Sequence, residues 1–298
     1  MKTTQILLSA LTISVLNACG GGGGSSTSQS SGSVSGVVTK GPLNAATVTA
    51  FAIASGQMGN QLASGVTDAT GAFSVALNGY SGPLMLQVSG GNFVDEATGL
   101  TMGMAPGDVM TLVIPSASLN QGMSGLQITP VTSMAQTLAE HMAGGMTDAN
   151  IQAANAATGS YFSVGDIVHT APMNPLTAGS GANAGVNAQN YGMVLASISQ
   201  YAQMQGVVST STMVSVLMKD AADGLMDGMN FGAPIMISTV SGSLQLPAGA
   251  GSTGLGGAMS TFMNSARNRS GVTTMPLMNR LNGTAGQMMS GSSMMGGR

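Results

Sequence analysis

Three aspartates near the end of a predicted helix form the densest group of carboxylates in this 298-residue sequence. Asp220, Asp223 and Asp227 are spaced so that they can share one face of a helix, where their oxygens could hold a hard cation such as Ca²⁺. The spacing lacks the alternating aspartates and closing glutamate of an EF-hand loop. Because Gly224 favours the end of a helix, a polar turn without metal is the competing interpretation.

The adjacent acids Asp95 and Glu96 offer a second set of oxygens for a hard cation. They stand close to Thr98 and Gly99, which are typical of a turn. The sequence therefore leaves two interpretations open for this pair, a calcium site and a solvated turn.

Methionine is frequent in this chain, with 26 residues against no tryptophan. Thioether sulfur is a soft ligand that selects Cu(I), so Met288, Met289, Met294 and Met295 could bind copper. Methionines at helical core positions are instead expected to fill gaps. We expect residues 286–298 to have nothing to pack against, so the alternative to a copper site is a disordered end.

No combination of residues in the sequence supports an enzyme. His141 and His169 are the only imidazoles, and Glu140 diverges from its neighbour His141 on a predicted helix. The chain has no Gly-x-Ser-x-Gly elbow and no Gly-Lys-Ser/Thr phosphate loop. One cysteine and two histidines are too few for a zinc site, and a net charge of −3 argues against nucleic acid as a partner. We therefore predict a non-catalytic protein with no cofactor beyond the candidate calcium or copper.

The N-terminal segment has the features of an export signal. Residues 1–18 combine one basic residue with a short apolar run and end in a small residue before Cys19. The run is too short to span a bilayer. Residues 19–32 are mostly glycine and serine, which predicts a flexible tether.

The junction of these two segments resembles a known processing site. Leu16-Asn17-Ala18-Cys19 is similar to the bacterial lipobox. The resemblance implies that Cys19 carries fatty-acyl chains such as palmitate and binds membrane lipid, because several acyl chains give stable attachment. It also implies sorting to the outer membrane, since Gly20 follows the cysteine in place of an aspartate. An ordinary export signal with an incidental cysteine is the alternative.

Residues 33–128 predict an antiparallel β-sandwich. Segments with alternating β-branched residues, such as 47–53, recur at short intervals between turn residues. Segments 62–67 and 72–77 flank residues 68–71, which predicts a hairpin with a four-residue connection.

Several motifs in this region occur in a fixed order: Gly36-Val37-Val38, Gly41-Pro42-Leu43, Ala46-Thr47-Val48, Thr67-Asp68-Ala69-Thr70-Gly71-Ala72-Phe73 and Gly90-Gly91-Asn92-Phe93-Val94-Asp95. Together they resemble the carboxypeptidase-regulatory-like (transthyretin-like) β-sandwich over about residues 33–100. The resemblance implies an accessory module, such as a spacer or adhesion unit, and it supplies no catalytic residues.

Residues 129–270 predict an α-helical domain. Met134, Leu138 and Met142 recur with the period of a helix, and Thr147 is expected to cap the next one. Further helices are expected near residues 190–202, 212–222 and 253–267.

Residues 271–298 predict a Met- and Gly-rich flexible tail. The predicted fold class is thus a multidomain α+β protein, an N-terminal antiparallel β-sandwich followed by an α-helical domain, between a disordered tether and a disordered tail. We expect a lipid-anchored protein of the bacterial cell envelope that binds an envelope protein or a glycan in a structural or adhesion role. Copper binding through the clustered methionines is the alternative function.

Overall fold

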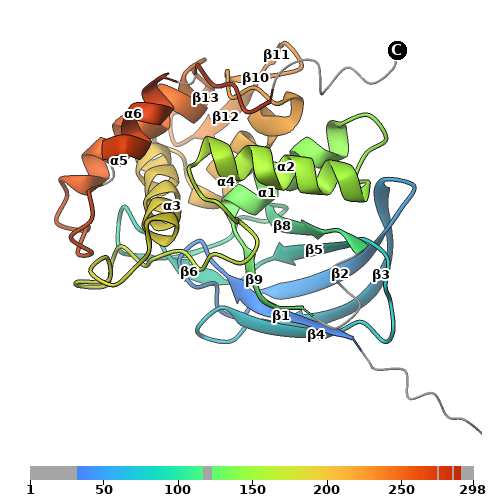
Figure 1. Ribbon diagram of the computed structural model, residues 1–298. Helices are drawn as coiled ribbons and strands as arrows, with labels where there is room; N and C mark the ends of the chain where they lie inside the picture. The colour runs from blue at the N-terminus through green and yellow to red at the C-terminus, as the bar shows by residue number, and fades with distance from the viewer. Residues whose placement is uncertain (1–31, 117–122, 274, 284, 290–298) are drawn as a thin grey trace, which may run out of the picture.

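A computed structural model describes residues 32–116, 123–273, 275–283 and 285–289. Within these ranges the chain is an α+β protein, as predicted: the strands of two main sheets come first, and six α-helices follow (Figure 1). Cys19 and most of the tether lie outside the described residues, as do Met294 and Met295.

The larger sheet is antiparallel and has the strand order β3-β2-β5-β8. Side chains alternate between its faces, so Val48 and Ala50 of β2 are buried whereas Thr47 is exposed. Its strands are β2 (Thr47–Ala54), β3 (Gln57–Val66), β5 (Leu84–Ser89) and β8 (Val109–Ile114). The smaller sheet has the strand order β4-β1-β9 and consists of β1 (Ser33–Val38), β4 (Ala72–Ala76) and β9 (Met123–Ile128). A separate pair is formed by β6 (Asn92–Val94) and β7 (Thr101–Gly103).

The prediction of purely antiparallel strands is wrong at one pair, because β9 runs parallel to β1. After β8 the chain joins the free edge of β1, and β9 leads directly into the helix that packs against β8. The two strands approach closely at Gly36, where a Cβ atom would lie 2.0 Å from the carbonyl oxygen of Leu126. A glycine is therefore required at this position.

The predicted hairpin of residues 62–77 does not form, although its turn does. The Asp68 carboxylate accepts from the amides of Thr70 (2.8 Å) and Ala72 (3.0 Å), and Gly71 has a φ of +79°. Strand β4 then pairs with β1 in place of β3. The turn therefore carries the chain from one sheet to the other.

The second helix begins at the capping residue that the sequence predicts, because Thr147 accepts a hydrogen bond in its first turn. Thr129 does the same for the first helix, and Gly144 follows that helix with a positive φ. The helices are α1 (Pro130–His141), α2 (Asp148–Tyr161), α3 (Val186–Met204), α4 (Thr210–Asp220), α5 (Leu255–Met263) and α6 (Met275–Gly283). Two short hairpins that the helical pattern did not predict lie between α4 and α5: β10 (Met229–Asn230) with β11 (Ala233–Pro234), and β12 (Met236–Thr239) with β13 (Gly242–Gln245).

The segment predicted as a flexible tail contains α6, so this prediction is wrong for residues 275–283. Leu277 and Leu281 are four residues apart and therefore lie on one face of the helix, where both are buried. α6 packs against α5, which supplies the apolar partner that the sequence pattern did not indicate.

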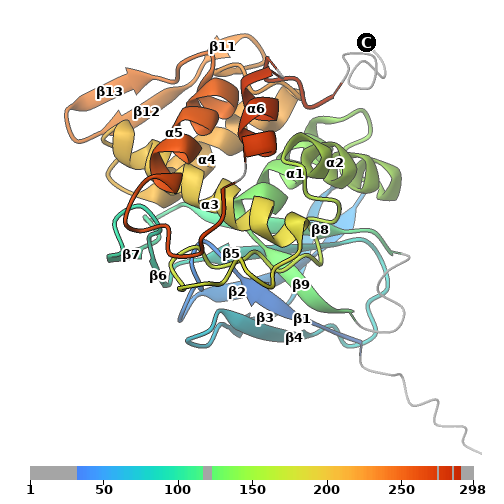
Figure 2. The same cartoon turned by 60° about the vertical axis from the view of Figure 1, so that its left-hand side comes forward.

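Buried apolar side chains form one continuous cluster that includes Val34 of β1, Leu138 of α1 and Phe262 of α5. β1 and β4 lie at the opposite end of the molecule from α5 and α6 in both views (Figures 1 and 2). Among the described residues, no helix has the length and apolar character needed to cross a membrane.

Candidate functional site

The most unusual chemical feature of the described residues is a buried cluster of Lys40, Glu96 and Ser199. Lys40 lies in the turn that follows β1, and Glu96 follows β6. Ser199 comes from the middle of α3, so the cluster joins three distant parts of the sequence. The turn is closed by the Leu43 amide, which donates to the Val38 carbonyl at 3.1 Å.

The three side chains are in mutual contact. Lys40 Nζ lies 2.5 Å from Glu96 Oε2 and 2.5 Å from Ser199 Oγ, and Ser199 donates to Glu96 Oε2 at 2.6 Å. The Lys40 and Glu96 side chains are only 2% and 4% exposed. The ammonium group also lies 5.7 Å from the centre of the Phe93 ring, which is a favourable distance for a cation. This is a fully desolvated ion pair with a hydroxyl bridge.

Asp95 extends the cluster towards α4. Its Oδ2 accepts from Thr210 Oγ1 at 2.6 Å, and its Oδ1 accepts from the Thr98 amide at 3.0 Å. Burial acts to raise the pKa of Asp95, but the charge of Lys40 and hydrogen bonds from Thr210, Ser199 and Thr98 outweigh it and hold this pKa below its ordinary value.

The pair Asp95 and Glu96 therefore does not form the solvated turn that was one of the two interpretations, because both residues are buried. Their oxygens accept from ammonium, hydroxyl and amide groups of the protein. Protein donors thus contact the carboxylate oxygens of both residues.

Cavities adjoin the cluster on two sides. One of about 170 Å³ is lined by Glu96 together with Gly41 and Leu195. Another of about 190 Å³ is lined by Asp95, Ser199 and Thr210. The two spaces thus lie next to the cluster, although its charged atoms are covered.

A second acidic contact holds the start of α4. Asp108 accepts from the hydroxyls of Ser211 (2.7 Å), Thr212 (3.1 Å) and Ser215 (2.8 Å). A carboxylate at a helix N-terminus also interacts favourably with the helix dipole. The acids of the β-sheet region thus bind the helices through serine and threonine.

The three aspartates that the sequence grouped as a calcium site each bind backbone amides. Asp220 Oδ1 accepts from the Gly228 amide at 2.6 Å, Asp223 accepts from the amides of Leu225 and Phe231, and Asp227 accepts from that of Met229. In the ranges that the structure describes, no three His, Cys, Asp or Glu side chains are gathered so that they could hold a metal. The arrangement is the polar turn that was the alternative interpretation.

Asp220 differs from its two neighbours because it is fully buried and its Oδ2 has no hydrogen-bond partner. Burial raises its pKa to about 7, and the charges of Asp227 and Asp223 add to this rise, while the Gly228 hydrogen bond opposes it.

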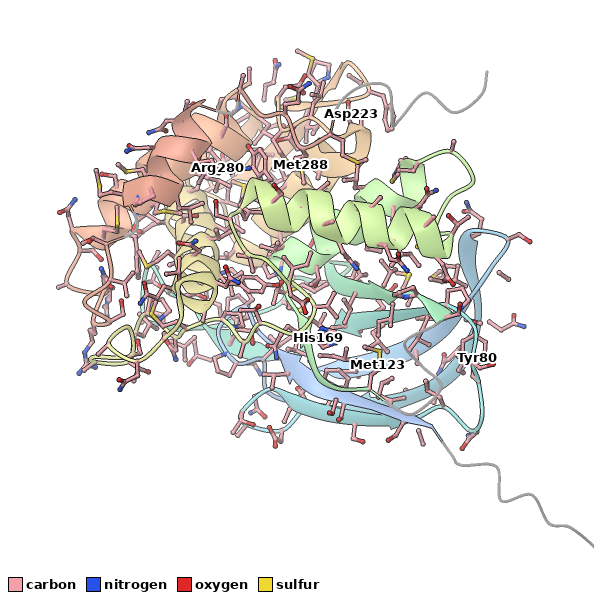
Figure 3. All side chains as sticks on the ribbon, viewed as in Figure 1. Tyr80, Met123, His169, Asp223, Arg280 and Met288 are labelled. Atoms are coloured by element: carbon pink, nitrogen blue, oxygen red, sulfur yellow. The ribbon has the colours of Figure 1, made fainter. Side chains whose placement is uncertain are left out.

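The methionines of the candidate copper site are divided. Met288 is 8% exposed and belongs to the apolar core, and its amide donates to the Gly224 carbonyl at 2.9 Å. Met289 packs against the same core. Residues 286–289 therefore do have a surface to pack against, contrary to the prediction, whereas Met294 and Met295 lie outside the described residues. Figure 3 shows Met288 near α6 and Asp223 nearby at the helical end of the molecule.

Both imidazoles bind atoms of their own segments. His141 Nδ1 lies 2.8 Å from the Thr137 carbonyl oxygen, and its ring contacts that of Phe231. His169 Nδ1 lies 2.8 Å from Asp166 Oδ2. Neither contact brings a histidine to a serine hydroxyl.

Sequence reasoning singled out Asp95 and Glu96 but missed Lys40 and Ser199. One signal was present in the sequence, because Lys40 and Lys219 are the only lysines after Lys2. Because positively charged side chains are rare in this chain, Lys40 is a candidate partner for the acidic pair Asp95 and Glu96. Ser199 carries no such signal, because it is one of many serines.

Comparison with protein-family models finds no matching family, and comparison with curated proteins finds no matching relative. Among solved structures, a 9R-lipoxygenase from Cyanothece is similar over 37% of this chain and 18% of its own, with 15% identity and a TM-score of 0.22. A likeness this slight supports no conclusion about fold or activity.

Proposed function

We propose that this protein is a lipid-anchored component of the bacterial cell envelope, held in the outer membrane through acylated Cys19. In this proposal a β-sandwich and a helical domain form its body, and its role is structural, adhesive or binding and does not include catalysis. The observation that carries the proposal is the order of segments: an export signal, a cysteine in a lipobox-like context, a Gly/Ser tether, and then a strand that begins at Ser33.

The position of the first strand gives the anchored protein an orientation. β1 starts at the end of the molecule that is farthest from α5 and α6 (Figures 1 and 2). In the sequence 13 residues separate Cys19 from β1, and Gly/Ser-rich linkers of that length span roughly 20 Å on average. The sheet region would then lie near the membrane, with the helices presented away from it.

The segment after α3 and the turn between β12 and β13 offer a partly apolar surface to a partner. Met204, Val208 and Val240 are all exposed, Val240 by 76%. They are neighbours, because the Val240 amide donates to the Gly206 carbonyl between the other two residues. Exposed apolar groups that lie together are typical of interaction sites. An envelope protein or an uncharged glycan fits such a surface better than a charged polymer.

The non-catalytic role is supported by how the buried polar residues are used. Glu96, Asp95 and Asp108 bind side chains of the same chain. These contacts join the sheet region to α3 and α4, which is a structural task.

The anchor is tested by fractionating cells that express the full chain or its Cys19→Ser variant. We expect the unaltered protein in the outer-membrane fraction with a fatty-acylated N-terminal peptide by mass spectrometry, and the variant outside the membrane fraction. An unacylated N-terminal peptide, or a Cys19→Ser protein that still partitions with membranes, would contradict the proposal. Cleavage by protease added to intact cells then reports whether the body faces outward.

A further inference from the structure

The contact between Lys40 and Glu96 holds an amine nitrogen against a carboxyl group, with both side chains almost fully buried. Nζ lies 2.5 Å from Oε2, and the two side chains are 2% and 4% exposed. The residues are 56 positions apart in the sequence, so the fold itself holds them together. An amine and a carboxyl group held in this way have the high effective concentration that favours reaction between them.

Condensation requires one proton to pass from the ammonium group to the carboxylate, so the reacting form is an amine beside a carboxylic acid. The contact of 2.5 Å between Nζ and Oε2 gives that proton a direct path. The Leu195 carbonyl oxygen, 3.4 Å from Nζ, helps to hold the amine in place.

Ser199 is placed to assist a condensation between these two groups. Its Oγ accepts from Lys40 Nζ and donates to Glu96 Oε2. Nζ must lose a proton when it attacks the carboxyl carbon, and the departing oxygen must gain one. The hydroxyl bridges these two atoms, so it can relay the proton from one to the other.

We propose that Lys40 and Glu96 form an intramolecular amide bond, with Ser199 as the proton relay. The bond between Nζ and Cδ forms, the bond between Cδ and Oε2 breaks, and one water molecule leaves. The charged pair and the amide plus water contain the same atoms, and no oxidant or further reactant is needed. The cavity of about 170 Å³ that Glu96 lines gives the water an exit.

The amide would fix the turn after β1 to the segment after β6. Asp95 would keep its hydrogen bonds from Thr210 and Thr98 after the charge of Lys40 is lost. This inference does not rest on anchoring through Cys19, because the reacting groups all lie inside the body of the protein.

Mass spectrometry of the full-length protein, denatured and digested after lysine and arginine, tests the bond. We expect no cleavage after Lys40, and therefore one looped peptide that contains both Lys40 and Glu96, ends at Lys219 and lacks the mass of one water. Lys219 is the internal control, because it is exposed and should be cleaved and acylated normally. Cleavage after Lys40 to the same extent as after Lys219, or full labelling of Lys40 by an amine reagent in denaturant, overturns the proposal.

Two serine variants separate the relay from the packing of α3. Ser197 is buried in the same helix and donates to the Val194 carbonyl, so Ser197→Ala is a matched control. We expect Ser197→Ala to be fully cross-linked and Ser199→Ala to lose most of the cross-link at equal time after synthesis. A Lys40→Arg variant should show no loss of water. Complete cross-linking of Ser199→Ala overturns the role of the hydroxyl.

Discussion

Two buried acidic sites of this protein differ in how their carboxylates are satisfied. Before the proposed amide forms, an ammonium group, three hydroxyls and a backbone amide donate to the oxygens of Glu96 and Asp95. At Asp220 one oxygen accepts from Gly228 and the other has no partner. The pKa of Asp95 is accordingly lowered, and that of Asp220 is raised to about 7.

Burial is common to both sites, so the number of donors and the nearby cation decide the direction of the shift. The stability that Asp95 contributes is present above its unfolded pKa of 3.8 and is lost as the pH falls below that value. The contribution of Asp220 is fully present below 3.8 and is lost as the pH rises towards about 7. The two sites therefore give stability profiles of opposite slope.

The largest expected effect comes from removing the cation of the first site. Lys40→Met removes both the ion pair and the proposed amide and leaves the Glu96 carboxylate buried without a partner on Nζ, and we expect it to lower the free energy of unfolding by about 3–5 kcal/mol. Urea denaturation of the full chain measures this. Lys219→Met is the control, because Lys219 is exposed and its loss should cost less than about 0.5 kcal/mol. Equal stability of the two variants would remove the distinction between the sites.

The second site predicts a change of opposite sign. Asp220→Asn keeps the acceptor for the Gly228 amide and removes the charge, so it should stabilise the protein at pH 8 and have little effect at pH 4. The difference between 3.8 and about 7 corresponds to up to about 4 kcal/mol. Because the asparagine amide would lack an acceptor, we expect a net gain of about 2 kcal/mol. Urea unfolding at both pH values measures it, and a destabilised variant at pH 8 would contradict it.

The sequence predicted the features whose signals are local and missed the contacts between distant segments. The helix α1 could be predicted, because its signal, the spacing of Met134 and Leu138, is local. The turn at Asp68 was predicted for the same reason. The contact of Lys40 with Ser199 spans 159 positions, and no local pattern encodes it.

The prediction of strand pairing was wrong for a similar physical reason. The order of turns along the chain predicts neighbours in sequence, but β4 and β9 both pair with β1, which comes much earlier. Gly36 is a sequence feature that fits the pairing of β1 with β9, because a side chain there would collide with the backbone of Leu126. The acidic residues of both sites were visible as clusters, whereas their partners and burial depended on the packing of distant elements.

A smaller effect is expected from removing one donor at the first site. Thr210→Val deletes the hydroxyl that donates to Asp95 Oδ2 at 2.6 Å, and a hydrogen bond to a charged group contributes about 1.5–3 kcal/mol. The variant should raise the pKa of Asp95, so its acid unfolding should begin at a higher pH than that of the unaltered protein. Thr261→Val, at an exposed position of α5, is the matched control. If acid unfolding of the variant began at the same pH as that of the unaltered protein, Thr210 would not hold this carboxylate in its ionised form.

The smallest effect tests which cause dominates at Asp220. Burial is the main reason for its raised pKa, and the charge of Asp227 adds less. Asp227→Asn should therefore lower the pKa of Asp220 only slightly and change stability at pH 8 by less than about 1 kcal/mol. Following the Asp220 carboxyl resonance by NMR across pH 4–8 measures that pKa directly. If this substitution returned the pKa to its ordinary range, repulsion between carboxylates rather than the missing donor would explain the contrast with Asp95.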